Sequence, residues 1–514
     1  MKNLKLYALL MLMVIALACK NTPENQTGSL PRSTPETEGV SSGAILAFLD
    51  SAAASEHEFH SIMIIRHGKV IAEGWWSPYD SILRHTLYST SKSFTSTAVG
   101  FAVTEKLITV NDKVISFFPE DLPDTVSPYL AQLTIKDLLM MSAGQDPDPT
   151  WSLRNGNDNW VKAFLATPIV NEPGKKFLYN SMATYMLSAI VQKVTGQKVV
   201  DYLTPRLFQP LGIKGMDWET DPKGINTGGW GLRIKTEDMA KFGQLLLQKG
   251  KWNGKEIIPE AWVNEATTMK IMQNPDARQS QKDSSDWLQG YCYQFWRCRN
   301  NAFRADGAYG QYIIVMPEKD AVVAITCESP NMQSEINLVW DYLLPAFKDE
   351  ELPENKPESD KLKERLASLS LAPASGSAAI AAKFTNPSEF VFPENPYHFK
   401  SITISLTDTC HVKFVFDSVE YPVDFGSGKW LKGETTMPGP SLTGALAGPQ
   451  KVAGSYAWKD AQTLELILRY IESPHHATIT CKFDRDKITV ALDYGKALGR
   501  PVIELKGSAS KIKN

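Results

Sequence analysis

Apolar residues follow strand-like spacing at both ends of residues 39–348 and helical spacing between them. Short β-branched runs flank a His-Gly-Lys turn near residue 68 and a Pro-Glu-Lys-Asp turn near residue 318, which predicts two hairpins. The expected strands are 62–66 with 70–75 and 309–316 with 321–327, and a helix is expected from about 333 to 347. This order predicts an α+β domain with one antiparallel sheet and a helical insertion.

A charged, proline-rich stretch separates this region from a second one. Residues 348–361 contain mainly Asp, Glu, Pro, Asn and Lys, so we expect a linker at 349–370. Beyond it, apolar and polar residues alternate, which predicts an all-β accessory domain at 371–514. Its sequence offers no recognisable nucleophile or metal-ligand cluster, and His475-His476 is expected to face solvent in a loop.

Composition narrows the class of protein. The 43% apolar and 22% charged residues of this 514-residue chain are typical of a globular protein with two or three domains. Its 54 basic and 57 acidic residues give a net charge of −3 without a basic block. A nucleic-acid partner is therefore not indicated.

The first residues resemble a targeting signal. Lys2 and Lys5 precede an apolar run, Leu6–Ala18, that is too short to cross a hydrocarbon core of roughly 30 Å comfortably. The small residue Ala18 followed by Cys19 resembles the end of a bacterial lipoprotein signal. This resemblance implies a signal peptide at 1–18, lipidation of Cys19, a polar tether at 19–38 and a membrane-anchored protein of the cell envelope.

Three serine motifs could each supply a nucleophile. Residues 39–43 fit Gly-x-Ser-x-Gly, but no buried strand precedes them, so Ser41 is interpreted as a helix cap. The pattern Ser-x-x-Lys occurs at Ser89–Lys92 and at Ser508–Lys511, and roughly two such matches are expected by chance. Only the first is followed by an apolar helical segment, so context favours Ser89.

The spacing of Ser89 and Lys92 suits nucleophilic catalysis. Residues three apart share a helix face, so the amine and the hydroxyl would lie together at a helix N-terminus. Burial would lower the pKa of Lys92 and allow a neutral amine to accept the hydroxyl proton. An ordinary N-terminal serine with a solvated lysine is the alternative reading of the same pattern.

The surrounding residues resemble the penicillin-recognising serine hydrolases. This family contains class C β-lactamases, D,D-peptidases, esterases and 6-aminohexanoate-oligomer hydrolases. The nucleophile segment of the family resembles residues 87–95, and further matching segments follow in the family's order. They are Pro173–Ser181, Gly228–Leu232, Gly250–Gly254 and Gly307–Gln311. The resemblance covers about residues 35–348 and implies a β-lactamase-like hydrolase domain at 39–348, with helices on both faces of its sheet.

The resemblance also implies roles for particular residues. Ser89 would be the acylated nucleophile, Lys92 its activating neighbour and Tyr179 the phenol that relays protons to the leaving group. The oxyanion would lie between the N–H groups of Ser89 and Ala308, the residue after Gly307. The mechanism implied needs no cofactor, and no metal site is indicated.

Two departures from the family pattern bear on the substrate. Ser181 stands where the family's second motif, Tyr-x-Asn, has Asn, so a hydrogen-bonding group remains but the amide is lost. Ala305-Asp306-Gly307 aligns with Lys-Thr-Gly or His-x-Gly, and Arg304 cannot simply replace the missing cation because successive strand residues face opposite sides. We therefore expect weak or no β-lactamase activity, since β-lactams carry a carboxylate that this cation binds.

Two functions follow from these residues. The first is an envelope serine hydrolase that cleaves an ester or amide of a small-molecule or peptide substrate through an acyl-Ser89 intermediate. The second is a protein of the same fold that binds or senses a peptidoglycan-like ligand without turnover, with the β domain making contacts.

Overall fold

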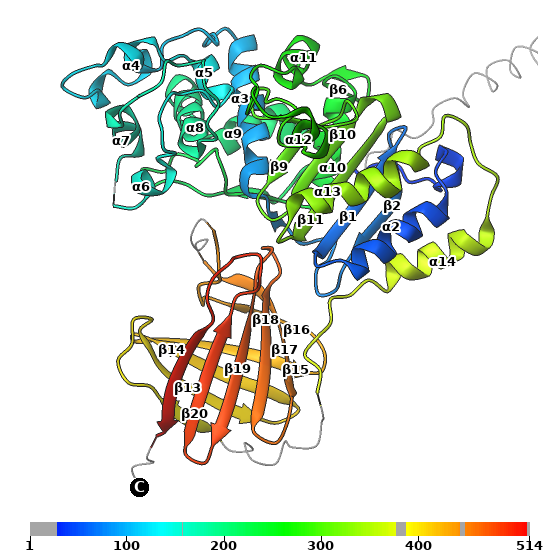
Figure 1. The fold of residues 1–514 in the computed structure, drawn as a ribbon, viewed down its shortest axis with the longest axis vertical. Coiled ribbons are helices and arrows are strands. Elements are labelled where there is room, and N and C mark those ends of the chain that lie inside the picture. Colours follow the sequence, from blue (N-terminus) through cyan, green and yellow to red (C-terminus); the bar gives the residue numbers. More distant parts are fainter. Residues whose placement is uncertain (1–27, 157, 377–386, 443–447, 511–514) are drawn as a thin grey trace, which may run out of the picture.

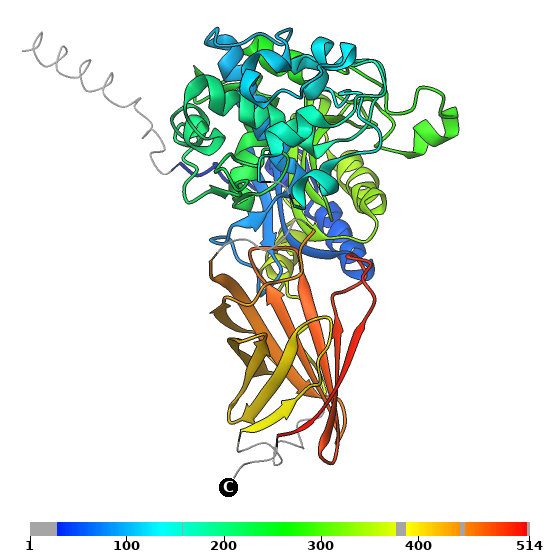
Figure 2. The same cartoon turned by 90° about the vertical axis from the view of Figure 1, so that its left-hand side faces the viewer.

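The computed structural model describes residues 28–156, 158–376, 387–442 and 448–510 (Figure 1). A mixed α/β domain lies above a closed β-sheet domain in this view, and both views show the two domains in contact (Figures 1 and 2). The predicted signal peptide and Cys19 lie outside the described residues. Within the described residues, no helix is long and apolar enough to span a bilayer.

One six-stranded antiparallel sheet forms the centre of the α/β domain, as predicted. Its strand order is β2-β1-β11-β10-β9-β8, so strands from both ends of the domain sequence pair side by side. The bounds are β1 Glu58–Arg66, β2 Lys69–Trp75, β8 Trp296–Arg297, β9 Phe303–Gly307, β10 Gln311–Met316 and β11 Ala321–Glu328. Because β9 lies inside the sheet, its end is fixed in space by β10 and β8.

Helices cover both faces of this sheet, which confirms the predicted fold class. Along β1, Met63 and Ile65 enter one core while Ile62 and Ile64 enter the other. The second core is closed by α2 (Ser42–Ala54), α13 (Met332–Leu338) and α14 (Lys356–Ala367). The first core is closed by α3 (Ser91–Thr104), α8 (Ser181–Thr195) and α10 (Thr236–Leu247). A strand segment buried on both sides is apolar, as residues 62–65 of β1 and 321–325 of β11 show.

Shorter elements complete the helical insertion between β2 and β8. The helices are α4 Pro128–Gln132, α5 Ile135–Leu139, α6 Thr150–Arg154, α7 Trp160–Ala166, α9 Val199–Leu203, α11 Glu260–Thr267 and α12 Gln279–Ser284. The strands are β3 His85–Thr86, β4 Asp217–Trp218, β5 Leu232–Ile234, β6 Lys251–Trp252 and β7 Lys255–Glu256. β3 pairs with β5 immediately before α3 begins, so this small sheet positions the start of that helix.

The accessory domain is all-β, as predicted. Its ten strands run in the order β15-β14-β13-β12-β21-β20-β19-β18-β17-β16, and β15 also pairs with β17, which closes the sheet. The bounds are β12 Ser388–Val391, β13 Phe399–Leu406, β14 Thr409–Phe416, β15 Val419–Ser427, β16 Leu431–Thr435, β17 Gln450–Trp458, β18 Thr463–Tyr470, β19 His476–Asp484, β20 Lys487–Asp493 and β21 Ile503–Ala509. The alternating apolar residues predicted from the sequence face the enclosed core.

The predicted tether and linker contain more structure than their composition indicated. Leu30 is buried against the α/β domain, and Arg32 forms ion pairs with Glu73 and Glu237. In the predicted linker, α14 packs on α2 and β2 and buries Leu362. A mostly charged segment can still form a docked helix when its few apolar side chains, here Leu362 and Leu366, lie on the face that meets a core.

The interface between the domains corrects one prediction. His475 is completely buried instead of facing solvent, and His476 begins β19. Both imidazoles contact Glu328 at the end of β11. Nearby, Glu472 forms ion pairs with Arg84 and Arg233 across the same interface. Local polarity suggested exposure, but these partners lie far away in sequence and could not be read from the dipeptide.

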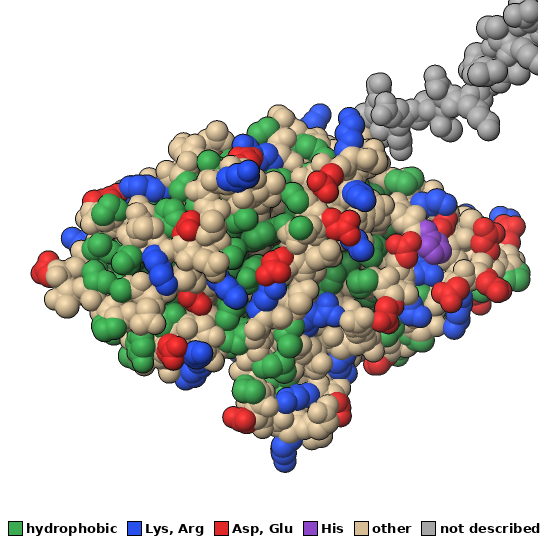
Figure 3. Space-filling model, turned by 90° about the horizontal axis from the view of Figure 1, so that it is seen from above, with side chains coloured by type: hydrophobic (Ala, Val, Ile, Leu, Met, Phe, Trp, Pro, Cys, Tyr) green, Lys and Arg blue, Asp and Glu red, His purple; other side chains and the backbone are tan. Residues whose placement is uncertain are grey.

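Charge is distributed evenly over the outer face of the α/β domain. Figure 3 shows Lys and Arg side chains interspersed with Asp and Glu, with apolar side chains between them. No block of one sign gathers on the described residues of this face.

Candidate active site

Ser89 lies in a tight turn just before α3. The turn is held on both sides, because Leu87 N–H donates to Leu232 C=O at 3.0 Å and Thr90 Oγ1 donates to Gln311 C=O at 2.7 Å. Tyr88, the residue before Ser89, has a φ of 46°, which is unfavourable for a residue with a side chain. The turn thus presents Ser89, which is partly exposed, at the N-terminal end of a buried helix.

Lys92 lies one helical turn away and is 1% exposed. Its Nζ contacts three oxygens, Ser89 Oγ at 3.1 Å, Ser181 Oγ at 2.9 Å and the Gly229 carbonyl at 2.6 Å. Burial lowers the pKa of Lys92 to about 7, and the more distant carboxylates Asp148 and Asp306 offset only part of that shift. A substantial fraction of this amine is therefore neutral near neutral pH and can accept a proton.

Tyr179 directs its phenol toward Ser89. The hydroxyl groups of the two residues are close enough to interact, and the Tyr179 ring centroid lies 4.9 Å from Lys92 Nζ. Trp296 stacks on the ring at a centroid distance of 5.6 Å and holds it in place. Burial raises the pKa of Tyr179, so the phenol stays protonated and is a proton donor. The structure brings Ser89, Lys92 and Tyr179 together.

Gly307 allows β9 to approach the nucleophile turn. A Cβ atom on Gly307 would lie 2.2 Å from the Leu87 carbonyl oxygen and 2.9 Å from Thr90 Oγ1, distances that no side chain tolerates. This close approach places Ala308, the next residue, beside the turn that carries Ser89. The oxyanion role of the Ala308 N–H remains a prediction from the family resemblance.

Asn180 and Ser181, neighbours in the second motif, make different contacts. Asn180 is buried and caps α8, since its Oδ1 accepts from the N–H groups of Met182 and Ala183. Its amide also donates to Gln145. Ser181 instead directs its hydroxyl to Lys92. Asn180 therefore serves the fold, and Ser181 is the residue that contacts the candidate catalytic amine.

Arg304 is buried, and the contacts that its guanidinium makes lie within the protein. It has no exposed surface, and its guanidinium donates to Asp306 at 2.7 Å and to the Asp286 carbonyl at 2.9 Å. The guanidinium carbon also lies 4.4 Å from the centroid of the Trp287 ring. A substrate carboxylate cannot reach this cation, which agrees with the argument from the sequence.

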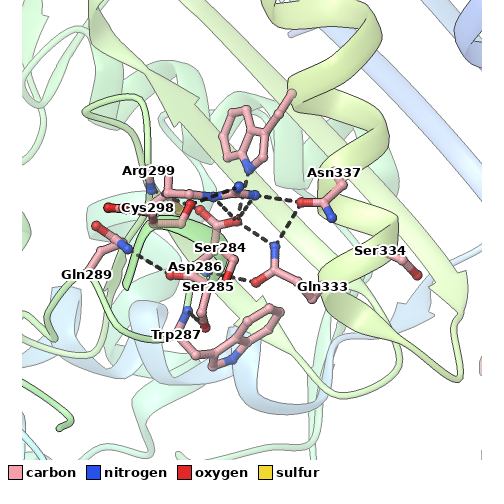
Figure 4. A network of polar contacts seen from close by, with 12 residues as sticks. Ser284, Ser285, Asp286, Trp287, Gln289, Cys298, Arg299, Gln333, Ser334 and Asn337 are labelled. Atoms are coloured by element: carbon pink, nitrogen blue, oxygen red, sulfur yellow. Dashed lines mark hydrogen bonds and ion pairs between the residues drawn. The ribbon is translucent and has the colours of Figure 1, made fainter. Parts of the chain in front are cut away.

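A polar network around Asp286 fixes that arrangement (Figure 4). The Asp286 carboxylate accepts hydrogen bonds from Arg299, Gln333 and the Trp340 indole. Burial alone raises the pKa of Asp286, but these hydrogen bonds, with Arg299 first, outweigh burial and lower it. The carboxylate is thus ionised and anchors the segment that leads to Trp287 and β8.

A cavity of about 60 Å³ opens beside Ser89. Its lining residues are Tyr88, Ser89, Thr150, Trp151, Arg154, Ser181, Gly229, Trp230 and Leu442. Leu442 belongs to the accessory domain, so both domains contribute to the cavity wall. No carboxylate of the described residues lies within ion-pair distance of Arg154, although burial lowers its pKa and Glu219 acts on it from farther away. The sequence did not single out Arg154 or Leu442, because no motif marks them, and it assigned no role to Gly229 within the segment Gly228–Leu232.

The competing serines have other roles. Ser41 caps α2, since its Oγ accepts from the Ala44 N–H at 3.0 Å, as interpreted from the sequence. Ser508 is exposed on β21, far from any apolar helix. Among the described residues, only Ser89 combines a helix N-terminus, a buried lysine and a neighbouring phenol.

Comparison with known proteins defines the class. The model of the family described as Beta-lactamase matches residues 56–348, which is more than half of the chain. The chain belongs to the Beta-lactamase family and is a serine hydrolase of that family.

Several curated relatives have the names of hydrolases. The chain is 24% identical over 280 residues to "6-aminohexanoate-dimer hydrolase" of Paenarthrobacter ureafaciens, covering 51% of this chain and 71% of that protein. It is 25% identical over 180 residues to a "Putative D-alanyl-D-alanine carboxypeptidase" of Salmonella schwarzengrund, covering 30% of this chain and 42% of that protein. The solved structure of a "Putative 6-aminohexanoate-dimer hydrolase from Bacillus anthracis" matches with a TM-score of 0.52 and 21% identity, over 63% of this chain and 89% of that one. This last likeness supports the fold.

Proposed function

We propose that the protein hydrolyses an ester or amide through an acyl intermediate on Ser89. The observation that carries this proposal is the contact of Ser89 with a buried lysine whose pKa is about 7. A lysine that is half neutral near pH 7 can act as a general base, which an exposed lysine cannot do at that pH. The nearby protonated phenol of Tyr179 supplies the complementary acid.

The proposed reaction conserves protons at each step. Neutral Lys92 takes the Ser89 hydroxyl proton as Oγ attacks the carbonyl carbon, and the N–H groups of Ser89 and Ala308 stabilise the oxyanion. The bond to the leaving alcohol or amine then breaks, and that group takes a proton from Tyr179, which regains one from the Lys92 ammonium. Water hydrolyses the acyl-serine by the same path, which releases the acid and restores the site.

The cavity beside Ser89 and the names of the relatives support the proposed substrate class. Trp151 and Trp230 line the cavity beside Ser89, so apolar surface is available to the acyl group of a substrate. The relatives named as hydrolases of 6-aminohexanoate dimers support amide cleavage. Ala305 occupies the β9 position where the family usually has a cation, so we propose weak or no β-lactamase activity.

A fluorophosphonate probe tests the proposal. Labelling of the wild type that is lost in Ser89→Ala and kept in Ser508→Ala is expected. If the probe does not label the wild-type protein, the alternative function, ligand binding or sensing without turnover, would be supported instead. A panel of p-nitrophenyl esters, D-amino-acid amides and a chromogenic cephalosporin then ranks the substrates, and brisk cephalosporin hydrolysis would contradict the argument from Ala305.

We also propose that the protein is anchored in the bacterial cell envelope through a lipid on Cys19. The apolar run before Ala18 and Cys19 supports this proposal, as does the polar composition of the residues that follow. The anchor would hold the hydrolase domain at the membrane surface.

A further inference from the structure

The accessory domain inserts a histidine beside the nucleophile turn. His475 Nε2 lies 2.6 Å from the Tyr88 hydroxyl, and Tyr88 directly precedes Ser89. His475 Nδ1 lies 2.6 Å from a carboxylate oxygen of Glu328, at the end of β11. A single buried imidazole therefore connects the central sheet with the turn that carries the nucleophile.

The protons of this Glu328–His475–Tyr88 chain can be assigned from its partners. Burial by itself raises the pKa of Glu328, but hydrogen bonds from His475 and His476 outweigh burial and lower it. The ionised carboxylate thus accepts the Nδ1 proton of His475. Burial raises the pKa of Tyr88, so its phenol stays protonated and donates to Nε2 when the His475 ring is neutral. The Tyr88 oxygen can then accept from the Leu442 N–H, 3.5 Å away on the accessory domain.

His475 also contacts the other side of the site. The ring of Tyr309, the residue after Ala308, meets the His475 ring edge to face at a centroid distance of 4.8 Å. Tyr88 and Tyr309 pack together with centroids 5.6 Å apart. The three rings form a cluster between the residue before Ser89 and the residue after Ala308.

Both tyrosines have strained backbones. Their φ angles are 46° for Tyr88 and 64° for Tyr309, and residues with a side chain rarely adopt such conformations. A strained residue persists only where its surroundings hold it. His475 stabilises both positions, through its hydrogen bond with Tyr88 and its ring contact with Tyr309.

We propose that His475 is a positioning residue that fixes the two backbone N–H groups of the oxyanion site through Tyr88 and Tyr309. The hydrolase site is then incomplete without the accessory domain, which accounts for a histidine buried at the interface. This inference rests on the proposed function for its kinetic consequence, while its structural consequence can be measured without any activity.

Two variants of the full-length protein test the proposal. His475→Ala removes the imidazole, and Tyr88→Phe removes only the hydroxyl and keeps the ring. Lys432→Ala is the matched control, because it removes another contact between the domains, the ion pair of Lys432 with Asp80 at 3.1 Å, away from Ser89. Hydrogen–deuterium exchange of peptides covering 87–91 and 307–310 reports on the turn, and the hydrolysis of a p-nitrophenyl ester reports on catalysis.

Faster exchange in both peptides is expected for His475→Ala, and faster exchange in the 87–91 peptide is expected for Tyr88→Phe. Each variant should lower kcat about 10- to 100-fold with little change in KM, and the double variant should be no slower than His475→Ala. Lys432→Ala should resemble the wild type in both measurements. Wild-type exchange and kcat in His475→Ala would overturn the proposal. If the wild type is inactive, the proposed function fails, and the exchange data alone decide whether His475 holds the turn.

Discussion

Lys92 Nζ lies 3.1 Å from Ser89 Oγ, one helical turn away and out of contact with bulk solvent. The amine is held by two further oxygens, so its position relative to the hydroxyl is fixed before substrate arrives. Acylation in this account depends on the fraction of Lys92 that is neutral.

The pH dependence of acylation follows from that contact. The neutral amine is the active form, so kcat/KM should rise with pH through about 7, the pKa of Lys92, and fall about tenfold per pH unit well below it. The measurement is kcat/KM for a neutral p-nitrophenyl ester between pH 5 and 9, corrected for spontaneous hydrolysis. Lys92→Arg stays charged and should lose about 10²- to 10⁴-fold in kcat/KM. A flat profile with an active Lys92→Arg protein would remove Lys92 from the mechanism.

Gly307 should be intolerant of even a methyl group. Gly307→Ala forces β9 away from Leu87, because the added Cβ would lie 2.2 Å from the Leu87 carbonyl oxygen. We expect loss of most ester hydrolysis and a lower melting temperature. Gly433→Ala on β16 is the control, since a Cβ there meets nothing within 4 Å, and it should leave both quantities unchanged. Equal behaviour of the two variants would show that the close approach of β9 is unimportant.

Arg154 should favour substrates that carry an anionic group. It lines the cavity with Ser89 and has no ion-pair partner among the described residues, so its charge is available to a substrate carboxylate. Arg154→Ala should raise KM about tenfold for the p-nitrophenyl monoester of a dicarboxylic acid, consistent with about 1.5 kcal/mol for a charged hydrogen bond. KM for a neutral ester of the same length serves as the internal control. An equal rise in KM for both esters would mean that Arg154 does not distinguish charged from neutral substrates.

Lipidation of Cys19 can be tested directly. We expect the cell-expressed protein to partition into detergent and to incorporate a labelled fatty acid, and Cys19→Ala to lose both properties. Mass spectrometry of the mature N-terminus should find a modified Cys19 as the first residue. An unmodified N-terminus that includes residues 1–18 would contradict the lipoprotein proposal.

Periodicity and the order of the motifs predicted much of the fold. They also predicted the three residues that the structure brings together, Ser89, Lys92 and Tyr179. The i, i+3 spacing brings Ser89 and Lys92 together once the segment is helical, and the apolar residues that follow predict that it is. Tyr179 and Gly307 could be found only through family resemblance, because a tyrosine and a glycine have no chemical signal of their own in a sequence. The alternating spacing after residue 371 was enough to predict an all-β domain.

Long-range partners could not be predicted in the same way. His475 is 387 residues away from Tyr88, and nothing local to a His-His dipeptide indicates that a distant carboxylate and phenol will enclose it. Gly229 contributes a backbone carbonyl, which every residue has. Arg154 lies on a short helix whose approach to Ser89 depends on tertiary packing. Such contacts are products of the fold and become visible only in three dimensions.

Trapping the covalent intermediate tests the central claim most directly. A slowly hydrolysed p-nitrophenyl ester should, within seconds of mixing, add the mass of its acyl group to the peptide that contains Ser89. That mass should disappear at the rate of turnover and should never form in Ser89→Ala. Ester hydrolysis that persists in Ser89→Ala, or an acyl group found on another residue, would contradict the account.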